Sequence, residues 1–180
     1  MARSFFRDLS GFSKSDMYAV GGTGTVYHYN GEKWRLATFP TNKLLWTVCC
    51  AGDGFVYISD FDGSVWKERG ERWIRVVNDG LSVPYFDMVW FDGRLWCAND
   101  YGIWILEDKK LVLTMYAKHK PIPPEVVVLS KRIDVSPDGT VMMVCGSRGP
   151  HFMVVMNETC YLIQWCLSNS QQGSTYVNYN

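Results

Sequence analysis

The sequence predicts an all-β fold made of repeated units of four short strands, and two observations support this prediction. A hairpin pattern occurs twice: "GTVYHYNGEKW", from Gly24 to Trp34, returns 39 residues later as "GSVWKERGERW", from Gly63 to Trp73. Aromatic residues, which favour strands, make up 15% of the 180 residues. Segments with helical periodicity are nearly absent. A chain of this length buries roughly 70% of the surface that its unfolded form exposes, so a substantial core is expected.

The interval of 39 residues continues outside these two hairpins. It separates Tyr18 from Tyr57 and Tyr57 from Trp96. A fourth copy is degenerate, because its Asp-Gly pair at 138–139 follows the pair at 92–93 by 46 residues. The extra length fits the insertion around "KHKPIPPE". The chain therefore contains four related units.

Turn signals divide the first two units into strands. In the first unit, "GGTG" at 21–24 and an Asn-Gly pair at 30–31 separate stretches that alternate between polar and apolar residues. In the second, "AGDG" at 51–54, "DFDG" at 60–63 and Gly-Glu at 70–71 have the same role. We expect strands at 4–12, 16–20, 25–29 and 32–37 in the first unit, and at 44–50, 55–59, 64–69 and 72–77 in the second.

The third and fourth units follow the same order. "DG" at 92–93 and "DYG" at 100–102 divide the third unit, and "PDG" at 137–139 and "SRGP" at 147–150 divide the fourth. We expect strands at 85–91, 94–99, 103–107 and 111–117 in the third unit, and at 126–136, 140–146, 151–156 and 160–166 in the fourth.

Four-stranded units repeated at about 40 residues are typical of a β-propeller, in which each unit buries its faces against its neighbours. We predict a small β-propeller with four blades of four antiparallel strands. The propeller takes up residues 1–168, with blades at about 3–39, 40–79, 80–118 and 124–167. Residues 169–180 form a polar C-terminal tail, which is a frayed end, an edge strand or a cap on the ring. Ring closure then requires packing of the first unit against the fourth.

The stretch "SDMYAVGGTGTVYHYNGEKW", residues 15–34, resembles the repeat of a family of bacterial propellers. That family includes large secreted propellers and photosystem-assembly-factor-like proteins. Short members of this kind resemble immunity proteins encoded beside polymorphic toxins, including toxins of type VI secretion systems. The resemblance implies a non-catalytic, cytoplasmic protein that binds and neutralises a cognate toxin. The matching positions are fold residues, so the resemblance assigns no catalytic residue.

Charge and composition restrict the other classes of function. Lys and Arg (18) equal Asp and Glu (18), and without a basic surplus we expect no nucleic-acid partner. No apolar run has the length of a membrane span or a signal peptide, so we expect no membrane association and a cytoplasmic location. The six cysteines lie in apolar strand-like segments, which predicts free thiols.

The sequence offers no recognisable set of catalytic or metal-binding residues. His28, His119 and His151 lack zinc-ligand spacing, and no base can be assigned to the adjacent thiols of Cys49 and Cys50. The "GGTG" stretch lacks the Lys-Ser/Thr pair of a phosphate-binding loop. We therefore predict that the protein is not an enzyme and uses no cofactor.

The turns between second and third strands, together with the connections between blades, are expected on one rim of the propeller. Acidic and aromatic side chains are frequent there, and such a surface suits a basic protein partner. Turns also favour Asp for conformational reasons, which is the alternative. The predicted partner-binding residues are Phe39, Asp60, Phe61, Asp62, Asp79, Tyr85, Asp100, Tyr101, Arg148 and His151.

Two further possibilities stay open. Trp34, Trp66, Trp73 and Trp104 occur at repeat-related positions and would line pockets in a lectin-like, carbohydrate-binding propeller. The protein is either a monomer or a homodimer, because four blades without a shared terminal blade leave sheets able to pair across two chains.

Overall fold

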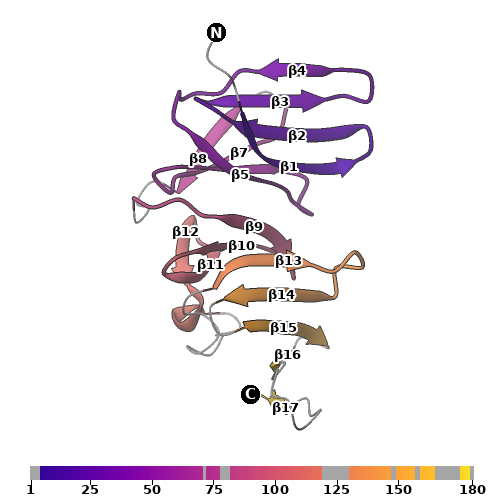
Figure 1. The fold of residues 1–180 in the computed structure, drawn as a ribbon, viewed down its shortest axis with the longest axis vertical. Coiled ribbons are helices and arrows are strands. Elements are labelled where there is room, and N and C mark those ends of the chain that lie inside the picture. Colours follow the sequence, from indigo (N-terminus) through magenta and orange to yellow (C-terminus); the bar gives the residue numbers. More distant parts are fainter. Residues whose placement is uncertain are drawn as a thin grey trace.

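The computed structural model confirms the predicted fold class: four antiparallel sheets follow one another along the chain (Figure 1). The structure describes residues 5–70, 72–77, 82–118, 130–146, 149–156, 159–164 and 175–178. Side chains are described up to Cys145, apart from Ser130. Within this part of the chain, no helix is long and apolar enough to cross a membrane.

Each of the first three sheets has four strands in sequence order. The first contains β1 (Phe6–Ser13), β2 (Asp16–Gly21), β3 (Thr25–Tyr29) and β4 (Trp34–Ala37). The second contains β5 (Leu45–Cys50), β6 (Val56–Asp60), β7 (Val65–Glu68) and β8 (Trp73–Val77). The third contains β9 (Asp87–Phe91), β10 (Arg94–Asn99), β11 (Gly102–Glu107) and β12 (Lys110–Leu113), followed by the 3₁₀ turn η1 (Thr114–Tyr116).

The fourth sheet has five strands. They are β13 (Ser130–Val135), β14 (Val141–Gly146), β15 (Gly149–Met156), β16 (Thr159–Gln164) and β17 (Thr175–Asn178). Strand β17 lies in the predicted polar tail and pairs antiparallel with β16. Of the three placements considered for the tail, residues 175–178 therefore adopt the edge strand.

The repeated hairpin has the same geometry in the first two sheets. Gly24 and Gly63 both have positive φ angles, of 65° and 77°. A Cβ atom at Gly24 would clash with the carbonyl oxygen of Thr41, and one at Gly63 with that of Val83. Glycine is therefore required at this corner because the connection to the next blade passes directly over it.

Three apolar clusters hold neighbouring sheets together. Val20 and Val26 of the first sheet meet Leu45, Val48 and Ile58 of the second. The second and third sheets share a cluster that contains Tyr57, Val65, Tyr85, Leu95 and Cys97. The third and fourth share one that contains Trp96, Ile103, Ile105, Met142 and Val144. The core thus lies between sheets, as expected for blades that cannot bury their faces alone.

The four sheets form an open arc. In the described residues, extensive contacts between sheets join only neighbours in the chain, such as β1 with β5, β5 with β9, and β9 with β13. Figure 1 shows β1 and β13 nearer the middle of the molecule, with β4 at one end of the long axis and β17 at the other. The first and fourth sheets therefore extend in opposite directions from a shared centre. The closure expected from packing of the first unit against the fourth is not observed in the described part.

Candidate partner-binding face

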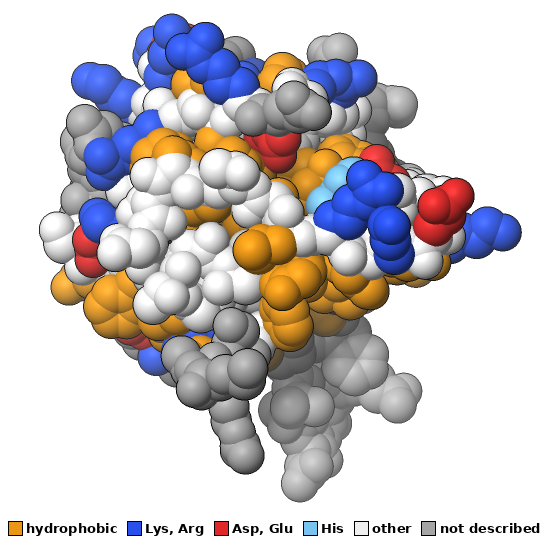
Figure 2. Space-filling model, turned by 90° about the horizontal axis from the view of Figure 1, so that it is seen from above, with side chains coloured by type: hydrophobic (Ala, Val, Ile, Leu, Met, Phe, Trp, Pro, Cys, Tyr) orange, Lys and Arg blue, Asp and Glu red, His pale blue; other side chains and the backbone are white. Residues whose placement is uncertain are grey.

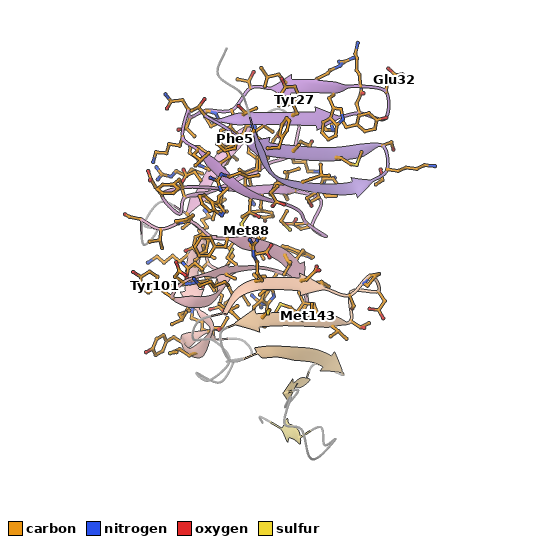
Figure 3. All side chains as sticks on the ribbon, in the orientation of Figure 1. Phe5, Tyr27, Glu32, Met88, Tyr101 and Met143 are labelled. Atoms are coloured by element: carbon orange, nitrogen blue, oxygen red, sulfur yellow. The ribbon has the colours of Figure 1, made fainter. Side chains whose placement is uncertain are left out.

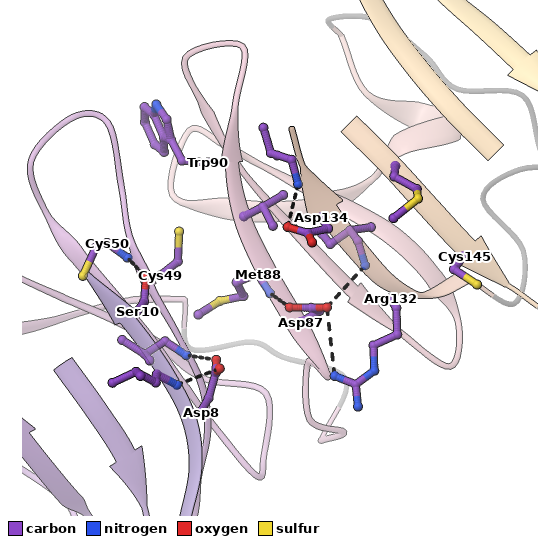
Figure 4. A pocket seen from close by; sticks show the side chains of 16 residues that line it. Asp8, Ser10, Cys49, Cys50, Asp87, Met88, Trp90, Arg132, Asp134 and Cys145 are labelled. Atoms are coloured by element: carbon purple, nitrogen blue, oxygen red, sulfur yellow. Dashed lines mark hydrogen bonds and ion pairs between the residues drawn. The ribbon is translucent and has the colours of Figure 1, made fainter. Parts of the chain in front are cut away.

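The innermost strand of each sheet lines a central groove of about 620 Å³ (Figure 4). Asp8 on β1 accepts hydrogen bonds from the Thr47 hydroxyl (2.5 Å) and the Val48 amide (2.8 Å) of β5. Asp87 on β9 accepts one from the Ile133 amide of β13 (3.4 Å). In both cases a carboxylate on one innermost strand binds the backbone of the next. These acids therefore hold the arc together at its centre.

Burial changes the ionisation of groups in the groove. The pKa of Asp87 rises to about 6 because the carboxyl is desolvated, and nearby Asp8 adds to the rise. Hydrogen bonds from the Ile133 and Met88 amides and the charge of Arg132 oppose it. Burial also raises the pKa of the Cys49 thiol to about 12 and that of Cys50 to about 11. Both thiols are protonated at neutral pH, which makes them poor nucleophiles.

One rim of the arc carries a connected set of aromatic and charged side chains, which we call the mouth face. The Arg7 guanidinium lies 3.9 Å from the centre of the Trp46 ring, and this ring contacts both Phe61 and Phe86. Arg132 donates a hydrogen bond to the Phe86 carbonyl oxygen (3.2 Å). The mouth face comprises Arg7, Lys43, Trp46, Phe61, Asp62, Phe86, Asp100, Tyr101, Lys131 and Arg132, and a hollow of about 440 Å³ opens among Phe5, Arg7, Trp46, Phe86 and Arg132.

Four of the predicted site residues lie exposed on the mouth face. They are Phe61, Asp62, Asp100 and Tyr101. Figure 3 shows Tyr101 at the outer end of its sheet, on the side of the molecule opposite Glu32. Turns from successive blades were predicted to meet on one rim, and these four side chains do lie on a single surface.

The predicted acidic character of this rim needs correction. Asp62 forms a 2.6 Å ion pair with Lys43, and Asp100 forms one of the same length with Lys131. Lys43 lies in the connection that leads into the blade of Asp62, whereas Lys131 lies on the innermost strand of the blade that follows that of Asp100. With Arg7 and Arg132 beside these two pairs, the described part of the mouth face therefore has no acidic surplus.

The prediction that Asp60 contacts a partner at the surface is wrong, because Asp60 is fully buried. Its carboxylate accepts hydrogen bonds from the amides of Asp62 (3.0 Å) and Ser64 (2.9 Å) and from the Trp66 indole (3.4 Å). Asn99 has the same role one blade later, accepting from the Tyr101 amide and the Trp104 indole, both at 2.9 Å. This position therefore shapes the turn, which is the alternative explanation for an Asp there.

Two predicted aromatic residues are also packed inside the molecule. Tyr85 is buried between the second and third sheets. Phe39 is partly buried, with its ring 4.9 Å from that of Trp73 and 5.6 Å from that of Trp66. Tyr85 is thus removed from the surface, and most of Phe39 contributes to the junction of the first two blades.

The three remaining predicted residues lie wholly or partly outside the described part of the chain. Asp79 and Arg148 are outside the described residues. His151 lies on β15, where its backbone pairs with Val144 and Gln164, but its side chain is outside the described part. Their contribution to partner binding stays a prediction.

Sequence reasoning missed Arg7, Trp46, Phe86 and Arg132, which surround the mouth hollow. All four lie at or next to the beginning of an innermost strand, where the chain enters a blade from the mouth side. Trp46 appears in "LLWTVCC", which reads as a uniformly apolar strand. The order of strands in a blade could have indicated these residues. Each innermost strand begins on the same rim as the turns between second and third strands, from which the predicted site residues were taken.

His28, one of the three histidines without zinc-ligand spacing, is partly exposed in the first sheet. His28 Nε2 lies 2.7 Å from a carboxylate oxygen of Asp16, and its ring stacks on Tyr18 at 4.3 Å. Among the tryptophans considered for a lectin-like site, the indoles of Trp66 and Trp104 bind the buried side chains of Asp60 and Asn99. These two indoles therefore serve the turns of their own blades.

The architecture defines the class of protein: it is a β-propeller. Among solved structures, the chain is similar to YCF48 from Cyanidioschyzon merolae (TM-score 0.57, 13% identity, covering 97% of this chain and 71% of that one). It is also similar to YCF48 bound to D1 peptide (TM-score 0.56, 12% identity, 89% and 61%) and to the WD40 propeller domain of Doa1 (TM-score 0.58, 12% identity, 89% and 61%). At these identities the likeness concerns the fold alone.

A more specific likeness is found among curated proteins. The chain is 32% identical over 101 residues to the immune protein Tsi7 of Pseudomonas aeruginosa. The match covers 56% of this chain and 33% of Tsi7, so it spans about a third of that relative. No family model matches the chain.

Proposed function

We propose that this protein is a cytoplasmic immunity protein that binds and neutralises a toxin delivered by a type VI secretion system. The observation that carries the proposal is the 32% identity to the immune protein Tsi7. The fold supports it, because propellers present rims of turns on a rigid scaffold and commonly bind other proteins through them. Neutralisation takes place by occlusion of the toxin, without a chemical step.

The mouth face is the surface we propose for the toxin. Phe61 and Tyr101 are exposed there and provide aromatic anchors, which contribute much of the binding energy in protein interfaces. The hollow among Arg7, Trp46 and Arg132 provides a concave site beside them. Two ion pairs fix this surface before binding, one at the entry to the second blade and one between the third and fourth blades, which reduces the entropy lost on association.

The lack of an acidic surplus on the described mouth face changes the kind of partner we expect. Because the two exposed acids already face lysines, the described surface has little acidic potential to attract a strongly basic toxin. We propose instead that aromatic contacts supply most of the affinity. Binding should then depend only weakly on salt concentration.

Co-expression with the product of the adjacent open reading frame tests this function. The protein should restore growth and form a stable complex in which the mass of the toxin is unchanged. The double variant Phe61→Ser/Tyr101→Ser should weaken binding roughly 100-fold, as expected for the loss of two aromatic anchors. Phe12→Ser is the matched control, because Phe12 is exposed at the opposite end of β1.

Two results would contradict the proposal. If the toxin remains lethal during co-expression, the immunity function is wrong for that pair. If protection is complete but the double variant binds as tightly as the parent, the toxin contacts another surface. Isothermal titration calorimetry at two salt concentrations distinguishes aromatic contacts from charge attraction.

A further inference from the structure

The mouth hollow carries a cation that has no carboxylate partner among the described residues. Arg7 is exposed near the start of β1, and its guanidinium lies over the rings of Trp46 (3.9 Å from the ring centre) and Phe5 (5.7 Å). The two lysines of the mouth face differ in this respect, because Lys43 and Lys131 each pair with an acid at 2.6 Å. Arg7 therefore has a charge and hydrogen-bond donors that the described part of its own chain does not use.

Trp46 holds this guanidinium in position. A guanidinium that stacks on an indole is attracted to the face of the ring, and it keeps its planar fork of N–H donors free at the edge of the stack. Trp46 is itself packed between Phe61 and Phe86, with ring centres 5.6 Å and 5.8 Å away. Arg7 is thus placed before a partner arrives, so less side-chain entropy is lost on binding.

The two acids that also line the hollow lie deeper and are already engaged. Asp8 accepts hydrogen bonds from groups of β1 and β5, and Asp87 accepts them from amides of β9 and β13 (Figure 4). Arg7 is exposed whereas Asp8 is half-buried. Arg132 is 69% exposed, and Asp87, which it meets at 4.0 Å, is 27% exposed. A group that enters the hollow from solvent therefore meets the two guanidiniums before it meets the carboxylates.

The surroundings of the hollow indicate that its occupant belongs to a protein. Trp46 lines the hollow and contacts Phe61, which is 47% exposed. An interface that covers Phe61 therefore borders the hollow and excludes water from a charge pair within it. The hollow measures about 440 Å³, so it can admit a side chain at the tip of a loop.

We propose that the mouth hollow receives an Asp or Glu side chain of the toxin, with Arg7 as its principal partner and Arg132 beside it. This inference rests on the proposed immunity function and adds the chemistry of one contact. Hydrogen bonds between a guanidinium and a carboxylate are roughly twice as strong as those between neutral groups. Salt screens an enclosed pair much less than a pair on the open rim, so this contact is compatible with binding that depends weakly on salt.

The affinity for the toxin encoded by the adjacent open reading frame, measured by isothermal titration calorimetry, tests the inference. Arg7→Met keeps an apolar stem over Trp46 but has no donor, and it should weaken binding roughly 30-fold. Arg7→Lys keeps the charge without the planar fork, so it should lose less, roughly fivefold.

A matched control separates this contact from general attraction by positive charge. Figure 2 looks onto the end of the molecule at which the first sheet lies and shows Lys and Arg at several places around its margin. Arg35 is exposed on β4 of this sheet, near the turn between β3 and β4 and so away from the mouth face. Arg35→Met should change the affinity less than about twofold.

The carboxylate is identified on the toxin. Each Asp and Glu on the surface of the toxin is replaced in turn by Asn or Gln. One of these changes should weaken binding to the parent protein roughly 30-fold and have little further effect on binding to Arg7→Met, because both changes remove the same contact.

The outcomes distinguish this inference from the proposed function. If the parent protein protects cells but Arg7→Met binds as tightly as the parent, the inference is overturned and the immunity function stands. A loss at Arg7 that couples to no carboxylate of the toxin would also overturn it, because Arg7 would then bind another group. A parent protein that neither binds the toxin nor protects would overturn the proposed function and this inference with it. Circular dichroism checks that the variants fold, and Arg7→Gln replaces Arg7→Met if the latter does not.

Discussion

Trp34 and Trp73 occupy the same place in two consecutive blades, yet their surroundings differ. Each is the first residue of the outermost strand and pairs with the last residue of the strand before it. Trp73 packs against Phe39 at the junction of the first two sheets. Trp34 is 42% exposed, with its ring near that of Tyr29 on its own sheet. The repeat thus determines strand position and register, whereas burial depends on whether a preceding sheet is present.

The same comparison extends to the innermost strands. Phe6 and Leu45 are equivalent positions, 39 residues apart, near the beginning of β1 and β5. Phe6 is 55% exposed and Leu45 is fully buried. Equivalent residues should therefore differ strongly in their contribution to stability.

The largest expected effect is that of Leu45→Ala. This change leaves a cavity between the first two sheets and should lower the free energy of unfolding by about 3 kcal/mol. Phe6→Ala, measured in the same way, should lower it by about 0.5 kcal/mol, as expected for a surface position. Urea denaturation at low protein concentration, where any self-association contributes least, measures both.

Equal losses in the two variants would contradict this comparison. They would show that the outward face of the first sheet is covered even in the isolated chain. A large loss at Phe6 that appears only at high protein concentration would instead be explained by association of two copies, which the sequence leaves open.

The next effect concerns the acids that join blades at the groove. Asp8→Ala removes the acceptor for the Thr47 hydroxyl and the Val48 amide. The loss should be about 2 kcal/mol, because the partner groups on the next sheet remain partly buried without an acceptor. Asp134→Ala is the control, since Asp134 is exposed and, among the described residues, accepts a hydrogen bond from the amide of its own neighbour Val135 and not from another sheet. A loss in the control as large as that at Asp8 would show that the bond between blades is not what matters.

These residues also show which features of the fold and of the candidate site could be predicted from the sequence. Alternating stretches and glycine corners are local features, so the strands, their antiparallel order and the rim of turns were all predictable. The environment of Asp60 was not, because an Asp in a turn reads the same whether it faces solvent or caps amides beneath the surface. The ion pair between Lys43 and Asp62 depends on how the connection into the second blade lies against the turn between β6 and β7, which the repeat interval does not specify.

The open arc was unpredictable for a related reason. Four units satisfy the repeat equally well in a small closed ring and in part of a larger one, because each unit contacts only its neighbours. The angle between successive sheets decides between them. That angle depends on side-chain volumes at three separate junctions, and no local pattern reports their sum.

The smallest expected effect is a dependence of stability on pH that arises at the junction between the third and fourth sheets. The pKa of Asp87 is raised to about 6 in the folded protein from an ordinary value of 3.8. Between these values the folded protein binds more protons than the unfolded chain, so stability should decrease as the pH rises from 4 to 6. We expect a decrease of about 1 kcal/mol from this group, because the half-buried carboxyl remains partly screened by solvent.

Asp87→Asn should remove this slope, since the amide does not titrate. Asp138→Asn is the control: hydrogen bonds from Ser136 and Thr140 lower the pKa of Asp138, so its titration lies below this range. Thermal melts at pH 4, 5 and 6 compare the two variants with the parent. If Asp87→Asn keeps the parent's slope, the carboxyl is not desolvated where the third and fourth sheets meet, and that junction is more open to water than the groove geometry indicates.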